Sequence, residues 1–424
     1  MYYRLGATVA RWFVNFCYEL VCDPAGFDRQ LAKAPPGAIR VYVFNHRSNF
    51  DPVVVAFGLV RQVAMSYAVG EWALVWPLSA IFRSFGSYFV RRGEPDPLYH
   101  AVLERFVQLL AGHGAVTGFF PEGGLTRDGA LRRARSGLLD YLIKLRREFP
   151  ERDLIFLPVG LNYDRVLEDR WLVRERDGRP PRAALVVRLA NLAALIVWVP
   201  WLLAANLLRV ATRSHRKFGY AAMEFGEPLL LSEWPGGATI HELDDALRKP
   251  AVDALATELL YQRIGRAIPV TPVAASCVAL LRPGALDDSA VVARIRDMLR
   301  EARKGGARIA LGRAFDDVKQ RRAAPDDLDS RMGGTDAQLL DLEEAERIWA
   351  LSRSQLSRRG VVWRRQGVIT VREPEVVEYY ALSIVHHLDA DWPAARDARK
   401  EAGEAGRPEV PWGVRDAAAP TRRP

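Results

Sequence analysis

Cysteine and histidine are scarce in this chain of 424 residues, which contains three of the first and seven of the second. Cys17, Cys22 and Cys277 are odd in number and lack the spacing of metal ligands, so a reducing, cytosol-facing environment is favoured over a disulfide-stapled one. Internal repeats, a phosphate-loop motif, a Gly-x-Ser-x-Gly elbow and a His-Glu-x-x-His zinc site are also absent. We therefore expect no metal site, and the pair His386-His387 predicts packing or surface contacts rather than ligands.

The charge and composition indicate a globular protein with an anionic partner. Hydrophobic residues make up 49% of the chain, and 60 Lys and Arg against 51 Asp and Glu give a net charge of +9. Such a balance suits nucleic acid, anionic lipid head groups or phosphorylated substrates. Eleven tryptophans and two long apolar stretches favour lipid, and no basic face with base-reading spacing is evident, so nucleic acid is not expected as a partner.

The stretch over residues 41–52 reads as a strand, a polar loop and the start of a helix. Asp51 is a good N-cap and Pro52 a good first helical residue, so His46 and Asp51 share one short loop at a helix N-terminus. An imidazole accepts a proton near neutral pH, and a carboxylate on its other nitrogen holds the tautomer and stabilises the imidazolium. These two residues therefore predict a general base that works without a nucleophile from the protein.

Residues 34–175 alternate strand-like and helix-like segments, which predicts an α/β domain with an open sheet and a site at the strand ends. Arg91 and Arg92 follow one predicted strand, and Arg127 follows the Pro-Glu-Gly-Gly loop after another. Guanidinium groups bind phosphate through paired hydrogen bonds, and the backbone amides of a glycine-rich loop add donors. Three arginines on the same rim as His46 therefore predict a phosphate site.

Two segments predict contact with a membrane. Residues 1–30 contain a helical mix of aromatic and aliphatic residues, which fits either an interfacial helix or a helix packed on the domain. Residues 189–208 carry no charge and would form a helix of about 30 Å, but Pro200 interrupts them and basic residues flank both ends. Because residues 225–229 look like a returning strand of the same domain, we expect a membrane-embedded hairpin at about 183–213 rather than a span.

After residue 30, the sequence predicts three parts. The α/β domain with the candidate site is expected to span residues 31–282, and residues 283–388 are expected to form a small helical region with a two-stranded wing turned at Gln366-Gly367. Residues 303–336 are poor in large apolar groups and predict a loose linker within that region. Alanine, arginine, proline and glycine dominate residues 389–424, which predicts a disordered tail.

Four blocks of the chain, taken in order, resemble those of the glycerol-3-phosphate and dihydroxyacetone-phosphate acyltransferases, within the lysophospholipid acyltransferase superfamily. The blocks are residues 41–52, 86–92, 119–127 and 156–165, and the stretches 225–229 and 378–387 extend the likeness. The resemblance implies an α/β fold with a mixed open sheet, flanking helices and a small, mostly helical C-terminal region. It also implies that His46 and Asp51 are the catalytic pair.

The same resemblance implies the remaining site residues. It implies that Arg92, with Arg91 beside it, binds the substrate phosphate, and that Glu122 and Gly123, with Gly124, position the polyol. The third block departs from the family, because this chain has Leu-Thr-Arg, ending at Arg127, where Arg-Ser-Arg is usual. The basic residue that usually follows stands here as Arg135.

The expected reaction is acyl transfer to glycerol 3-phosphate in phospholipid biosynthesis, with His46 as general base. The acyl donor is acyl-CoA or acyl carrier protein, a co-substrate, and no further cofactor is expected. Acylation of 1-acylglycerol 3-phosphate (lysophosphatidate) is the alternative, and a non-catalytic membrane tether is a third interpretation that the intact His46 and Asp51 disfavour. We expect the protein on the cytoplasmic face of the inner membrane, in contact with membrane lipids.

The hairpin interpretation predicts that both ends of the 183–213 segment lie on one side of a bilayer. Single cysteines placed before and after this segment should react with an impermeant maleimide from the same side of intact vesicles. Labelling from opposite sides would contradict the hairpin and indicate a span.

Overall fold

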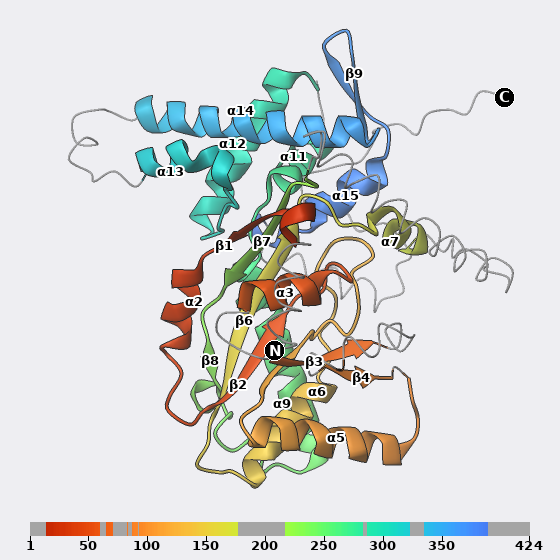
Figure 1. Ribbon diagram of the computed structural model, residues 1–424, viewed down its shortest axis with the longest axis vertical. Coiled ribbons are helices and arrows are strands. Elements are labelled where there is room, and N and C mark those ends of the chain that lie inside the picture. Colours follow the sequence, from red (N-terminus) through yellow and green to blue (C-terminus); the bar gives the residue numbers. More distant parts are fainter. Residues whose placement is uncertain are drawn as a thin grey trace, which may run out of the picture.

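A mixed sheet of eight strands organises the fold (Figure 1). The computed structural model describes residues 14–59, 65–70, 83, 87–91, 93–176, 217–282, 286–322 and 335–388. The strand order is β1-β7-β6-β2-β5-β3-β4, with β8 paired to β6. The pairs are parallel except that β6 runs antiparallel to β7 and β8. The expected α/β fold with a mixed sheet is therefore confirmed.

The strands are β1 (Glu19–Cys22), β2 (Ile39–Phe44), β3 (Met65–Gly70), β4 (Tyr88–Val90), β5 (Val116–Phe119), β6 (Leu154–Tyr163), β7 (Tyr220–Phe225) and β8 (Leu229–Leu230). The helices of this domain are α2 (Pro24–Leu31), α3 (Asp51–Leu59), α5 (Pro97–Gly112), α6 (Gly137–Lys144), α7 (Asp169–Arg176), α9 (Asp245–Glu258) and α10 (Gly265–Ala267).

Side chains of β2 alternate between two apolar clusters on opposite faces of the sheet. Tyr42 and Phe44 join the cluster that contains residues of α3 and of the C-terminal helices. Val41 and Val43 join the cluster formed with α5, α6 and α9. Because successive side chains of a strand point to opposite faces, β2 is covered by helices on both sides. Its almost unbroken apolar sequence reflects this double burial.

Two strands, β2 and β5, end side by side at the edge where the polar loops begin. Val43 of β2 pairs with Phe119 of β5, so the loops after these two strands start next to each other. Phe44, the last residue of β2, pairs with Val159, whereas β6 continues to Tyr163. The end of β6 therefore passes beneath the loop that follows β2.

The C-terminal helices pack on one face of this domain and share its core. They are α11 (Pro272–Leu281), α12 (Asp288–Lys304), α13 (Asp316–Arg322), α14 (Thr335–Arg358) and α15 (Pro374–Leu382). Val278 of α11, Ile348 of α14 and Tyr380 of α15 belong to the same apolar cluster as Leu161 of β6. Residues on both sides of the predicted boundary at 282/283 therefore share one hydrophobic core.

The predicted wing is confirmed as a hairpin of β9 (Val362–Arg365) and β10 (Val368–Val371), which projects at the top of Figure 1. Gln366 and Gly367 form its turn with φ values of 50° and 83°. Positive φ at both central residues is the signature of a two-residue turn that matches strand twist.

The expectation of a loose linker is wrong for residues 303–322. Ile309 forms a parallel bridge with Val270, and α13 follows. Arg322 and Arg303 both bind the carboxylate of Glu344 on α14, which is fully buried, and the shorter distances are 2.8 and 2.5 Å. These ion pairs join parts of the chain that are distant in sequence, so local composition did not indicate them.

The expectation of a continuous helix over residues 1–30 is also wrong where the structure describes this segment. Residues 19–22 form β1, which pairs with β7 at the edge of the sheet, and α2 follows. Residues 1–13, the 183–213 hairpin, and the 389–424 tail lie outside the described residues. No helix among the described residues combines the length and the apolar character that crossing a bilayer requires.

Gly129 lies where the loop after β5 meets α15. Its φ is 90°, and a Cβ atom at this position would come within 1.8 Å of the Tyr379 backbone oxygen. Because the obstructing atom belongs to the backbone, no side-chain movement can relieve this clash. The positive φ would strain any residue other than glycine as well. Gly114 has a similar φ of 86° but open space around it.

We therefore expect Gly129→Ala to lower the free energy of unfolding by about 2–4 kcal/mol, combining backbone strain with overpacking. Gly114→Ala should cost only about 1–2 kcal/mol, because strain acts there alone. Urea unfolding of both variants measures the difference. Equal losses would contradict the close approach of α15 to this loop.

Candidate active site

The His46 imidazole and the Asp51 carboxylate form a direct pair, with 2.9 Å between Nδ1 and Oδ2. The Asp51 side chain is fully buried, and that of His46 is 12% exposed. Asp51 Oδ2 also accepts hydrogen bonds from the amides of Arg47 and Ser48, at 2.7 and 3.0 Å. Asp51 is the first residue of α3, and its side chain faces back into the loop instead of capping the helix as predicted.

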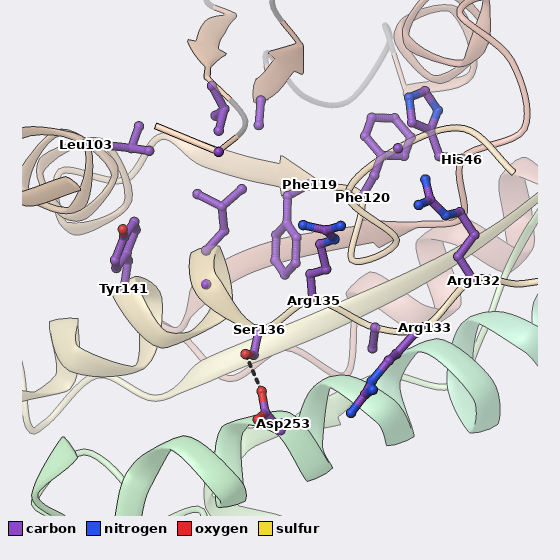
Figure 2. Close-up of a pocket in the computed structure, with 18 of the residues that line it drawn as sticks. His46, Leu103, Phe119, Phe120, Arg132, Arg133, Arg135, Ser136, Tyr141 and Asp253 are labelled. Atoms are coloured by element: carbon purple, nitrogen blue, oxygen red, sulfur yellow. Dashed lines mark hydrogen bonds between the residues drawn. The ribbon is translucent and has the colours of Figure 1, made fainter. Parts of the chain in front are cut away.

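The carboxylate determines which nitrogen of His46 can act as a base. Because Nδ1 faces a buried carboxylate, this nitrogen carries the hydrogen in the neutral ring, and Nε2 is left as the acceptor. The ring stacks on Phe120, with 4.2 Å between centroids and 25° between planes. Figure 2 shows His46 and Phe120 together at one end of a cavity.

Asn45 fixes the start of this loop to β6. Its side-chain amide donates to the Leu161 carbonyl at 2.9 Å, and its side-chain oxygen accepts from the Leu161 amide at 2.7 Å. The side chain thus continues the hydrogen bonding of β2 beyond its last paired residue. Sequence reasoning did not assign Asn45 a role, because its partner is more than 100 residues away.

Glu122 binds the backbone of the His46 loop and does not line the cavity. Its carboxylate accepts from the His46 amide at 2.7 Å and from the Arg132 amide at 2.8 Å, and the side chain is buried. Burial raises the pKa of Glu122 to about 6, against the opposing effect of these two amides. Gly123 and Gly124 line the cavity and Glu122 does not, so the expected role of Glu122 in positioning the polyol stays a prediction.

The cavity has a volume of about 720 Å³. Its lining includes both apolar and basic side chains. The apolar lining residues are Ala68, Val90, Leu103, Phe119, Phe120, Ala134 and Leu138. The basic lining residues are Arg91, Arg132, Arg133, Arg135 and Lys249, in addition to His46 and His100. The cavity therefore suits a ligand with an apolar part and an anionic part.

Arg135 crosses the glycine-rich loop to reach this cavity. A Cβ atom on Gly123 would lie 2.5 Å from Arg135 Cδ, so the glycine leaves room for the arginine stem. The Arg135 amide donates to the Pro121 carbonyl at 2.7 Å, which fixes its backbone beside the loop. In Figure 2, the side chains of Arg132 and Arg135 lie on the His46 side, while Arg133 points toward α9.

The three arginines expected on the rim have different positions. Arg91 lines the cavity and is exposed, with Glu94 3.9 Å away. Arg92 lies outside the described residues. Arg127 does not line the cavity, because its guanidinium is held by Glu175 at 2.7 Å, a hydrogen bond that raises the pKa of Arg127. The expected placement of Arg127 on the same rim as His46 is thus corrected, whereas Arg135 does line the cavity.

Comparisons with known proteins identify the class of this site. Residues 29–162 match the family model described as Acyltransferase, and this range includes the His46 loop and the cavity's arginines. Residues 204–324 match the model described as Glycerol-3-phosphate acyltransferase C-terminal region. Two separate stretches of this chain are therefore similar to acyltransferase family models.

Curated glycerol-3-phosphate acyltransferases are similar to this chain over part of their length. A glycerol-3-phosphate acyltransferase of Xanthomonas campestris is 28% identical over 263 residues, which cover 59% of this chain and 28% of that protein. One of Aeromonas hydrophila is 29% identical over 290 residues, covering 66% of this chain and 33% of that protein. The chain thus spans about a third or less of the length of these relatives.

A solved structure also shows partial likeness. The 1-acyl-sn-glycerophosphate (LPA) acyltransferase from Thermotoga maritima covers 60% of this chain and 77% of its own, with 14% identity and a TM-score of 0.32. A likeness at this level carries no argument about function.

Proposed function

We propose that this protein transfers a fatty acyl group from an acyl thioester to a hydroxyl of glycerol 3-phosphate. One observation carries the proposal: the His46 ring, oriented by a buried carboxylate, opens on the same cavity as several arginine side chains. A base and an anion-binding wall in one cavity are what an alcohol bearing a phosphate requires.

In the proposed reaction, His46 Nε2 takes the proton of the acceptor hydroxyl while its oxygen attacks the thioester carbonyl. The new C–O bond forms, and the C–S bond breaks as the tetrahedral intermediate collapses. The imidazolium then returns the proton to the departing thiolate. Asp51 stabilises the imidazolium between these steps, and no covalent acyl-enzyme is needed.

The phosphate of the acceptor is proposed to bind at the basic wall. Arg135 and Arg91 line the cavity together with Gly137, the first residue of α6. The Ser136 hydroxyl donates to Asp253 and makes no side-chain cap to this helix. The N-terminus of α6 therefore adds positive potential toward an anion held by the two guanidinium groups.

The acyl chain is proposed to lie along the apolar wall of the same cavity. Leu103 of α5 and Phe119 at the end of β5 are buried in the cluster beneath this wall. Acyl-CoA and acyl carrier protein both deliver the required thioester. The acyl transfer would then place the carbonyl carbon between this wall and His46.

We further propose that the protein works at the cytoplasmic face of a membrane, in contact with its lipids. The net charge of +9 supports attraction to anionic head groups. The uncharged stretch at 189–208 supports insertion into the apolar region.

We expect the wild-type protein to acylate glycerol 3-phosphate with a labelled acyl thioester, and His46→Ala to be slower by about 100- to 10,000-fold, the usual contribution of general-base catalysis. Assays with glycerol 3-phosphate, with 1-acylglycerol 3-phosphate, and with neither acceptor distinguish the alternatives. Circular dichroism verifies that His46→Ala is folded. Undiminished transfer by that variant would rule out the mechanism, and activity with only the second acceptor would replace the substrate.

Arg135→Ala should raise the KM for glycerol 3-phosphate by about 10-fold or more, because a hydrogen bond to a charged group contributes roughly 1.5–3 kcal/mol. Arg127→Ala is the matched control. It removes an arginine of the same loop whose guanidinium binds Glu175 and does not line the cavity. Steady-state kinetics with varied acceptor measures both values. A larger effect at Arg127 than at Arg135 would contradict the proposed phosphate site.

A further inference from the structure

Tyr163 reaches the catalytic loop from beneath. It is the last residue of β6, four residues beyond Val159, which pairs with the end of β2. Its hydroxyl donates to Asp51 Oδ1 at 2.7 Å, and its side chain is 1% exposed. The hydroxyl therefore binds the carboxylate oxygen opposite the one that faces His46.

The two oxygens of Asp51 thus have separate partners. Oδ2 accepts from the ring of His46 and from the amides of Arg47 and Ser48, while Oδ1 accepts from Tyr163. A buried carboxylate needs donors on both oxygens, because each lone pair left without one loses its hydration without replacement. Burial first, and then the charge of Asp51, keep the pKa of Tyr163 well above 10, so the phenol remains a donor.

We propose that Tyr163 is a positioning residue for the reaction: its hydroxyl orients the Asp51 carboxylate and limits the negative charge that acts on His46. This inference rests on the proposed role of His46 as general base. Without the phenol, Asp51 would keep more charge on the oxygen that faces the ring, and the imidazolium would be stabilised further. A base held as imidazolium cannot accept a proton, so activity would require a higher pH.

Several other charged side chains lie around the pair. Glu122, after β5, binds the His46 amide, and Glu168, before α7, binds the Ser48 hydroxyl and the Asn49 amide. Arg47 donates to the Gly129 carbonyl and lies over the ring of Tyr379 from α15. Arg132 and Arg135 line the cavity that His46 faces. Replacing Tyr163 by phenylalanine removes none of these contacts.

Tyr18 provides a matched control. It is equally buried, and its ring centroid lies 5.7 Å from that of Tyr163. Its hydroxyl donates to the Arg165 carbonyl at 2.7 Å. Tyr18→Phe therefore removes a buried hydroxyl from the same cluster without changing the partners of Asp51.

The test compares the pH dependence of kcat/KM for the wild type, Tyr163→Phe and Tyr18→Phe. We expect the acid limb of the Tyr163→Phe profile to move to higher pH by roughly one unit, since one unit corresponds to about 1.4 kcal/mol and charged hydrogen bonds contribute 1.5–3. On the acid limb, well below the midpoints of both profiles, its kcat should fall by up to about 10-fold, while KM for glycerol 3-phosphate stays unchanged. Tyr18→Phe should retain the wild-type profile. An unshifted Tyr163→Phe profile, or equal shifts in both variants, would overturn the inference.

A second measurement needs no substrate and separates this inference from the proposed function. In protein with ¹⁵N-labelled histidine, the pH midpoint of the His46 ring signals should be higher in Tyr163→Phe than in the wild type or Tyr18→Phe. Assignment uses the signal lost in His46→Ala. An unmoved midpoint would refute the role of Tyr163 even if the wild type acylates glycerol 3-phosphate. A moved midpoint with no acyl transfer by the wild type would refute only the proposed function.

Discussion

The arrangement of the site depends on one buried charge, the carboxylate of Asp51. A carboxylate without solvent is stable only when donors surround it, and here the ring of His46, two loop amides and the hydroxyl of Tyr163 supply them. These hydrogen bonds to Asp51 fix the conformation of the loop after β2, in which His46 faces the cavity. The same hydrogen bonds that stabilise the fold therefore orient the base.

Much of the fold could be predicted because its signals are local. The strand before His46, the hairpin turn at Gln366-Gly367 and the long α14 all follow from residues that are neighbours in the chain. Two elements were missed for the opposite reason. β1 becomes a strand only by pairing with β7, and the segment before Arg322 is ordered by the distant Glu344. Tertiary contacts decide both, and no short window of sequence contains them.

The site shows the same division. His46 and Asp51 lie on one loop, so their pairing was predictable from spacing, and His46 lines the same cavity as several arginines. The directions of Glu122 and Arg127 depend on how the loop after β5 folds over its glycines, so their positions were not predictable. In the sequence, Arg135 could be identified only as the basic residue that follows the third block. Its stem reaches the cavity because Gly123 has no side chain.

The central claim is that one cavity brings the acceptor's hydroxyl to His46 while arginines hold its phosphate. A crystal structure of the protein with glycerol 3-phosphate bound tests this most directly. The account predicts a hydroxyl oxygen within hydrogen-bonding distance of His46 Nε2 and a phosphate in contact with Arg135 or Arg91. A phosphate bound outside this cavity, or a hydroxyl directed away from His46, would contradict it.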